Sequence, residues 1–231
     1  MEGQEIKIYL ASPNNQLQAE HCIDQATLLS FACVRPWIES YIPAFGSLLI
    51  DSGAYSQMTT GKAIDVQEYK DWVEPLLPMI DNWAGLDDIN GDWRQSMRNY
   101  EAGGFPTIHD TDPPELLDDL IPLAEERGNW IGIGLKPPRQ GKEKFLRGVL
   151  DRIPPHLHVH GWALVAYRYL NRINSFDSTF WWHQVQDLRP KFPWLTPGEC
   201  LELAIKQVRR YSRVPGRYNV PSHTQMDLLD E

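Results

Sequence analysis

The chain has 231 residues, of which 42% are hydrophobic, and a formal net charge of −9 at pH 7. This length fits one large α/β domain or two small ones. No apolar run approaches the ~20 residues of a membrane span, and no basic-then-apolar signal pattern opens the chain, so we expect a cytoplasmic protein without a membrane partner. The three cysteines are odd in number and widely spaced, which argues against a disulfide framework.

The charge is unevenly distributed along the chain. Residues 1–135 hold 7 Lys and Arg against 22 Asp and Glu, whereas residues 136–217 hold 15 against 6. An acidic first half beside a basic second half is expected if one face meets phosphates, although a solvated helix and tail explain it equally well. The densest basic stretch, without an acid, contains Lys206, Arg209, Arg210, Arg213 and Arg217. An acidic tail, 218–231, follows it.

Eight short apolar runs are candidate strands, and several are apolar throughout, as strands covered on both faces are. In chain order they are Ile6–Ala11, Leu28–Cys33, Leu48–Asp51, Trp83–Asp87, Thr107–His109, Trp130–Gly134, His158–Leu164 and Ser175–Asp177.

Segments with helical spacing separate these runs. Asp65 and Glu68 form a capping box that predicts a helix from Val66. Further helices are expected from Pro114, over Lys142–Arg152 and over Pro197–Tyr211. Eight strands interleaved with helices predict a compact (β/α)8 TIM-like barrel over residues 1–217; an open doubly wound sheet is the competing topology, but no glycine-rich fingerprint follows the first strand.

Two short Asp-Ser motifs stand at the ends of predicted strands. Asp51 and Ser52 end the third run, and Asp177 and Ser178 end the eighth. Two carboxylates at strand ends suit a barrel enzyme that must place an acid/base and a nucleophile around one glycosidic bond. Each motif also has a structural interpretation, because Asp51 fits an Asx turn and Asp177 fits a helix N-cap.

The first motif resembles the Asp-Ser-Gly-Gly-Tyr/Phe-Gln signature of the tRNA-guanine transglycosylases. Over residues 45–182 the chain is similar to short, phage-encoded relatives that replace guanine with 7-deazaguanines in DNA. Further landmarks follow in the family's order: Asp87 with Asp88, the Gly132 and Gly134 strand, His160-Gly161-Trp162, and Ser175-Phe176-Asp177-Ser178 in place of Phe-Asp-Cys.

The resemblance implies a base exchange with Asp177 as the nucleophile, Asp51 as the general acid/base and no cofactor. Such an exchange needs a covalent sugar intermediate and a proton shuttle. The expected substrate-binding residues are Ser52, Gly53, Tyr55, Asp87, His109, Gly132, Gly134, His160, Gly161 and Trp162. Asp87 would read the guanine edge, and Tyr55 or Trp162 would stack on it. His109 fits a structural histidine equally well, and the glycines fit relief of crowding.

The chain also departs from the family. It lacks the Cys-x-Cys-x-x-Cys cluster of the structural zinc, so we expect no metal of that type, and it is much shorter than the tRNA enzymes. Both departures favour DNA as the polymer partner, with tRNA as the second choice, and leave a protein partner or homodimer open.

Two other function classes remain open. The first is a metal-dependent hydrolase, because His156, His158 and His160 alternate along a predicted strand and His-x-His is a good metal pair. The second is a non-catalytic nucleic-acid-binding subunit, which would have no need to keep both Asp51 and Asp177.

Overall fold

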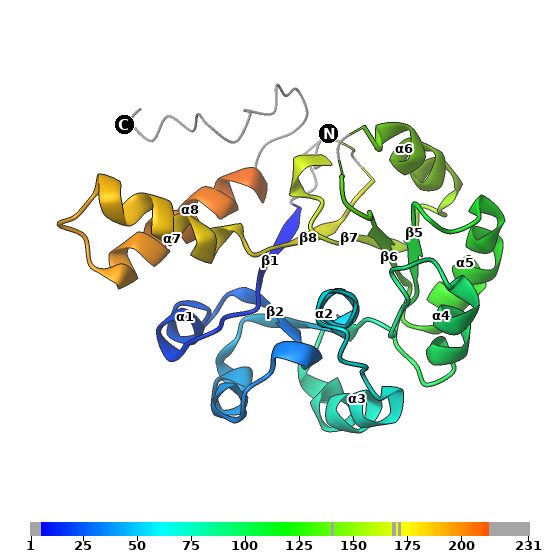
Figure 1. The fold of residues 1–231 in the computed structure, drawn as a ribbon, viewed down its shortest axis with the longest axis horizontal. Helices are drawn as coiled ribbons and strands as arrows, with labels where there is room; N and C mark the ends of the chain where they lie inside the picture. Colours follow the sequence, from blue (N-terminus) through cyan, green and yellow to red (C-terminus); the bar gives the residue numbers. More distant parts are fainter. Residues whose placement is uncertain (1–5, 140, 168–169, 171, 213–231) are drawn as a thin grey trace.

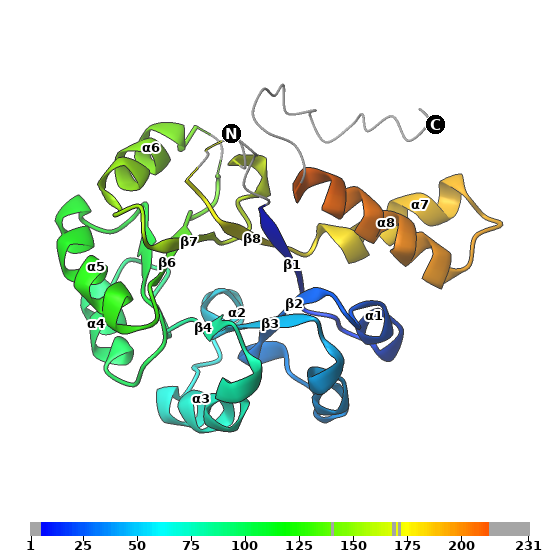
Figure 2. The same ribbon diagram turned by 180° about the vertical axis from the view of Figure 1, so that it is seen from behind.

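A computed structural model describes residues 6–139, 141–167, 170 and 172–212. Figure 1 shows a ring of strands surrounded by helices, and Figure 2 shows the same ring from behind. The strands are β1 (Lys7–Ala11), β2 (Ala26–Ser30), β3 (Ser47–Asp51), β4 (Asn82–Trp83), β5 (Thr107–His109), β6 (Trp130–Gly134), β7 (His158–Gly161) and β8 (Ser175–Ser178). The α-helices are α1 (Gln16–His21), α2 (Ala54–Thr60), α3 (Val66–Val73), α4 (Trp93–Tyr100), α5 (Leu117–Glu126), α6 (Glu143–Arg152), α7 (Phe180–Lys191) and α8 (Pro197–Ser212).

All eight strands pair in parallel, in the order β4-β3-β2-β1-β8-β7-β6-β5. The two ends of this curled sheet meet at a bridge between Ala84 and Phe105. Two backbone hydrogen bonds of 2.9 Å flank the bridge, from Gly85 N to Phe105 O and from Phe105 N to Trp83 O. The predicted (β/α)8 TIM-like barrel is therefore confirmed, and the open doubly wound sheet was the wrong alternative.

Helix α3 shows how the local sequence specifies an element. The Asp65 carboxylate accepts from Gln67 N and Glu68 N at 2.7 and 3.0 Å, as its capping position predicts. Tyr69 and Val73 are buried on the inner face of the helix. The Tyr69 hydroxyl donates to Ala84 O at 2.7 Å, which ties the helix to the strand end that closes the barrel.

Three strand predictions were wrong by more than one residue at an end. The second strand starts at Ala26 and stops at Ser30, because Phe31–Cys33 leaves the sheet as a 3-10 helix. The fourth strand stops at Trp83, beyond which only Ala84 bridges to β5. The seventh stops at Gly161, and Ala163 two residues later takes a left-handed conformation (φ 51°).

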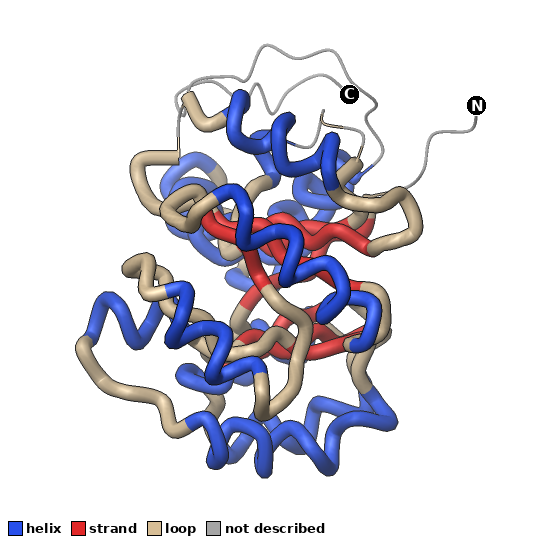
Figure 3. The backbone as a smooth tube through the Cα atoms, turned by 90° about the vertical axis from the view of Figure 1, so that its right-hand side faces the viewer, coloured by secondary structure: helices blue, strands red, loops and turns tan. Residues whose placement is uncertain are grey.

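The core has an inner and an outer part. Figure 3 shows the strands at the centre with helices around them. The barrel interior is filled by a cluster of small, aliphatic and aromatic side chains, Tyr9, Ala11, Leu28, Leu49, Ala84 and Phe105. Separate clusters lie between the sheet and its helices. The filled interior leaves the ends of the barrel as the places for polar groups.

Helices α7 and α8 form a hairpin on the β1 side of the barrel (Figure 1). Trp181 of α7 is fully buried, and its indole N–H donates to Ala11 O at 3.2 Å. Leu201 and Val208 of α8 are buried in the same cluster as Leu10 of β1. Thus the basic stretch that begins in α8 is anchored to the barrel by an apolar face.

Candidate active site

Polar side chains gather at one end of the barrel because its strands are parallel. Asp51 ends β3, His109 ends β5 and Asp177 lies in β8, while Asp87 follows β4. The charges of Asp87 and Asp177 both raise the pKa of Asp51, so the three carboxylates share one electrostatic environment. The carboxyl ends of barrel strands are where this fold builds active sites. The structure thus brings together the three aspartates expected from the sequence.

The Asp51 carboxyl group is adapted to hold a proton near neutral pH. Burial raises its pKa to about 6, and the charges of Asp87 and Asp177 act in the same direction. The nearby Ser30 hydroxyl and Gly53 N–H, two polar donors, offset part of this rise. A carboxyl group with a pKa in this range can give and take a proton at physiological pH.

Gly53 turns the chain directly after Asp51. Its φ of 89° is left-handed, and a Cβ built on it would lie 2.4 Å from the Cβ of Ala32. A side chain at this position would therefore push Asp51 away from the residues after β2. Ser52 is fully buried, and its hydroxyl accepts from Ala54 N at 3.4 Å. These two motif residues shape the turn, whereas Tyr55 on α2 is half exposed at the rim.

Asp87 and His109 form a buried pair. Asp87 Oδ2 contacts His109 Nε2, and both side chains are at most 10% exposed. Burial alone would lower the pKa of His109, but the hydrogen bond and charge of Asp87 outweigh it and raise the pKa above its ordinary value. The backbone N–H of His109 donates to Asp112 Oδ2 at 2.7 Å. Asp88 faces elsewhere and accepts from Asn90 N.

Asp177 is held by the loop that follows β7. Its Oδ1 accepts from Ala163 N at 2.6 Å and lies 3.5 Å from His160 Nε2. The left-handed backbone of Ala163 aims this N–H at the carboxylate. The side chain keeps 13% of its surface exposed. Asp177 is therefore fixed at one oxygen, while it still faces the barrel mouth.

Sequence reasoning missed Ser175, which links two histidines. Its hydroxyl lies 2.7 Å from His158 Nε2 and 2.9 Å from His160 Nδ1. Burial lowers the pKa of His158 to about 4, so its ring is neutral at pH 7. If His158 donates to the hydroxyl and the hydroxyl donates to His160 Nδ1, the remaining proton of His160 sits on Nε2 and faces Asp177. The alternating histidines are the sequence feature that could have revealed this chain of contacts.

This arrangement does not favour the metal-hydrolase alternative. His158 and His160 turn toward Ser175, and His156 lies outside β7, where it contacts Glu125 at 2.8 Å. Among the residues that the structure describes, no group of three or more His, Cys, Asp or Glu side chains could hold a metal ion.

The expected glycines relieve crowding, Gly132 and Gly134 against Thr107, Trp162 and His109, and Gly161 against the cluster that contains Phe176. A Cβ on Gly132 would lie 2.4 Å from Thr107 Oγ1 and 2.5 Å from Trp162 Nε1, which are hydrogen bonded to each other at 3.0 Å. A Cβ on Gly134 would lie 2.4 Å from His109 Nδ1. A Cβ on Gly161 would meet the ring of Phe176 at 2.9 Å. These glycines thus make room for Trp162 and His109.

The Trp162 side chain packs and hydrogen bonds within the barrel. Its ring stacks on Phe105, with centroids 6.0 Å apart and planes 7° from parallel. Its N–H is taken by Thr107, and His160 contacts it edge to face. Trp162 is still partly exposed, so a flat group can approach its free surface.

The expected nucleic-acid-binding residues are only partly described. Lys206, Arg209 and Arg210 are exposed on α8, and Arg209 contacts Gln25. Arg213, Arg217 and the tail 218–231 lie outside the described residues. The basic stretch therefore starts on a solvent-facing surface of a helix that is packed on β1.

Comparison with protein-family models, with curated proteins and with solved structures finds no match for this chain. Within the described residues, none of the helices has the length and apolar character needed to cross a membrane.

Proposed function

We propose that this chain is a base-exchange transglycosylase that replaces guanine with a 7-deazaguanine, such as 7-cyano-7-deazaguanine, in DNA. The observation that carries the proposal is the convergence of Asp51, Asp87 and Asp177 at the carboxyl end of the barrel. A double displacement at one sugar carbon needs a nucleophilic carboxylate and a second carboxyl group that moves a proton. Reading a guanine edge needs a third acceptor.

The geometry supports a different role for each aspartate. Asp177 attacks C1′ and the guanine leaves with a proton from Asp51, whose pKa of about 6 suits that transfer. Asp51 then takes the proton from the incoming base, whose nitrogen bonds to C1′ and releases Asp177. No redox cofactor or energy source is required, because one glycosidic bond replaces another.

Asp87 is the base-reading group in this proposal. His109 occupies its Oδ2, which leaves Oδ1 for the amino and ring N–H groups of guanine. A raised pKa of His109 keeps the imidazole charged over a wider pH range, and this holds Asp87 in place. Trp162, which is partly exposed, offers an aromatic surface for the base.

DNA is our first choice of polymer. In a duplex the target nucleotide must leave the stack for a carboxylate to reach C1′, at a cost of a few kcal/mol. The exposed cations of α8 would grip the backbone and offset this cost. We keep tRNA as the second choice and a non-catalytic nucleic-acid-binding subunit as the alternative of a different class.

The test is a base-exchange assay with labelled guanine in DNA and, in parallel, in tRNA, each incubated with unlabelled 7-cyano-7-deazaguanine. We expect release of label from DNA and a protein–DNA adduct that survives denaturation. Asp177→Asn should abolish both, whereas Asp187→Asn, an exposed carboxylate on α7, should change neither. Release from tRNA alone would overturn the choice of polymer. Release from neither polymer, or unchanged exchange in Asp177→Asn, would overturn the enzyme proposal.

A further inference from the structure

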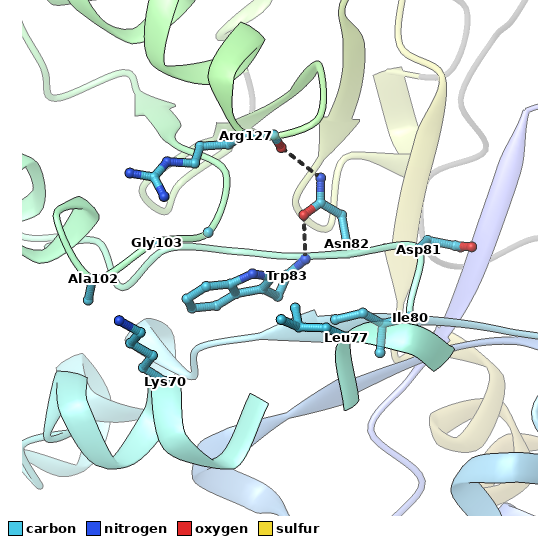
Figure 4. Close-up of a pocket in the computed structure, with 10 residues that line it drawn as sticks. Lys70, Leu77, Ile80, Asp81, Asn82, Trp83, Ala102, Gly103 and Arg127 are labelled. Atoms are coloured by element: carbon cyan, nitrogen blue, oxygen red, sulfur yellow. Dashed lines mark hydrogen bonds between the residues drawn. The ribbon is translucent and has the colours of Figure 1, made fainter. Parts of the chain in front are cut away.

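A separate candidate site lies at the opposite end of the barrel from the three aspartates. It is a cavity of about 420 Å³ beside the amino ends of β4 and β5, a size within the usual range for small-molecule sites. Its walls come from α3, from the segment after α3, and from the turns that follow α4 and α5. Figure 4 shows the ring of Trp83 in the middle, with the Lys70 ammonium on one side and the Arg127 guanidinium on the other.

The neutral polar groups of this cavity are already paired with one another. Asn82 donates from Nδ2 to Arg127 O at 3.1 Å, and its Oδ1 accepts from Trp83 N at 2.8 Å. Asp81 points away from the cations in Figure 4 and accepts from Lys7 and Ser47, each at 2.7 Å. Its charge is therefore neutralised on the other side.

The cations are the groups left without a counter-charge. No ion pair joins Lys70 or Arg127 to a carboxylate within the described part of the chain. The Nε atom of Arg127 is buried and has no hydrogen-bond partner among those residues. That atom is closed to solvent, so a ligand in the cavity would meet the outer guanidinium nitrogens of Arg127 and the Lys70 ammonium, two cationic groups that favour oxygen acceptors.

Gly103 keeps the cavity open. Its φ of 122° is unfavourable for other residues, and a Cβ there would lie 2.6 Å from the Trp83 ring and 3.7 Å from Arg127 Nη1. Any side chain at 103 would thus fill the space between ring and guanidinium. The apolar Leu77 and Ile80 line the remaining wall. The cavity therefore combines a flat apolar part with a cationic part.

We propose that this cavity binds a small organic anion that carries a flat ring, of the size of a nucleoside monophosphate. The ring would lie against Trp83 and Leu77, and the phosphate would accept from Lys70 and Arg127. This inference does not depend on the proposed base exchange, because no residue of the three-aspartate site lines the cavity.

The test is isothermal titration calorimetry of the full chain with dAMP as the probe, because the three-aspartate site is proposed to read guanine and would compete for dGMP. We expect saturable binding to one site, weakened at least about tenfold by Lys70→Gln and by Arg127→Gln. The exposed Lys191→Gln should bind as the unchanged chain does, and the melting temperature of each variant reports its folding. Deoxyadenosine and inorganic phosphate, tested singly, should each bind far more weakly than dAMP.

Four results would overturn this proposal. Three of them are no binding of dAMP at millimolar concentration, unchanged binding in both cation variants, or equal binding of deoxyadenosine or phosphate alone. The fourth is loss of binding in Asp177→Asn, which would assign the nucleotide to the three-aspartate site instead. None of these results depends on whether the chain exchanges bases.

Discussion

His160 faces Asp177 across the carboxyl ends of β7 and β8, with Nε2 3.5 Å from Oδ1. His160 is fully buried, and Ser175 holds its other ring nitrogen at 2.9 Å. A distance of 3.5 Å is at the outer limit of a hydrogen bond, and catalytic contacts of this length in unliganded enzymes often tighten when substrate binds. We infer that His160 positions Asp177, the proposed nucleophile, and does not itself react.

The first prediction is that His160→Gln lowers kcat of the proposed base exchange by about ten- to a hundredfold with little change in KM, because misplacing the proposed nucleophile, Asp177, affects the chemical step. Ser175→Ala should give a smaller loss of kcat, since it removes the contact with His160 Nδ1 but leaves the imidazole ring in the site. Steady-state kinetics measure both values. His156→Gln, an exposed histidine that contacts Glu125, is the control and should behave as wild type. A wild-type kcat in His160→Gln would show that His160 only fills space.

The barrel and the place of each strand along the chain could be predicted from sequence, because they depend on local patterns, although the ends of three strands could not. Continuous apolar runs such as Trp130–Gly134 identified buried parallel strands, and the capping position of Asp65 identified the start of α3. Parallel topology then required Asp51 and Asp177 to share one end of the barrel. The presence of these aspartates at one end of the barrel therefore follows from the predicted topology.

The contacts between side chains could not be predicted, because they depend on register and on turns. Ser175 meets both histidines only because β7 and β8 pair with His160 opposite Ser175. Asp87 reaches His109 only because β4 stops at Trp83, whereas the sequence favoured a strand up to residue 87. Nothing in an isolated sequence predicts that Lys70 and Arg127 flank Trp83, since α3 and α5 are far apart along the chain.

The second prediction concerns the Asp87–His109 pair. The pKa of His109 is raised in the folded chain, so the pair stabilises the fold fully below the unfolded value of about 6.5, and this contribution is lost as pH rises through the folded pKa. Asp87→Asn should therefore lower the free energy of unfolding by about 3 kcal/mol at pH 6 and by less at pH 9. Urea unfolding at both pH values measures this.

An NMR titration of the His109 ring gives a second readout of the same pair. Without Asp87 the effect of burial dominates, and the His109 pKa should fall below that of the unchanged chain. Asp88→Asn is the matched control, because Asp88 is the adjacent carboxylate and contacts Asn90. An Asp87→Asn chain with an unshifted His109 would contradict the pairing.

The third prediction is that Asp51→Asn stabilises the fold at neutral pH. The folded pKa of about 6 lies above the unfolded value of 3.8, so the neutral form is favoured in the folded state. Ionisation of Asp51 therefore costs stability progressively as pH rises from about 4 to 6, and fully above 6. Removing the charge should raise the free energy of unfolding by about 1–3 kcal/mol at pH 8, with no gain near pH 4.

Chemical unfolding at pH 8 and pH 4 distinguishes the loss of the Asp51 charge, which changes stability only at the higher pH, from an effect of the substitution that is the same at both pH values. Asp187→Asn, on the exposed face of α7, should leave stability within about 0.5 kcal/mol at both pH values. Destabilisation of Asp51→Asn at pH 8 would show that the carboxylate holds the turn around Gly53 together. The predicted gain in stability at pH 8 would instead indicate that the ionised Asp51 destabilises the fold. Acid/base groups in active sites commonly have such a cost.

The last prediction concerns the basic surface of α8, which consists of Lys206, Arg209 and Arg210. Their replacement together by Gln should weaken binding of a DNA oligonucleotide, because each phosphate contact releases a counterion. The slope of log K against log salt concentration should become shallower by up to about 0.9 for each lost contact in a duplex. Fluorescence anisotropy between low and moderate salt measures both quantities.

Arg94 and Arg98 of α4 are also exposed cations, and their replacement by Gln is the control that should leave affinity and slope unchanged. If the control weakens binding as much as the α8 variant does, net charge and not α8 governs DNA binding.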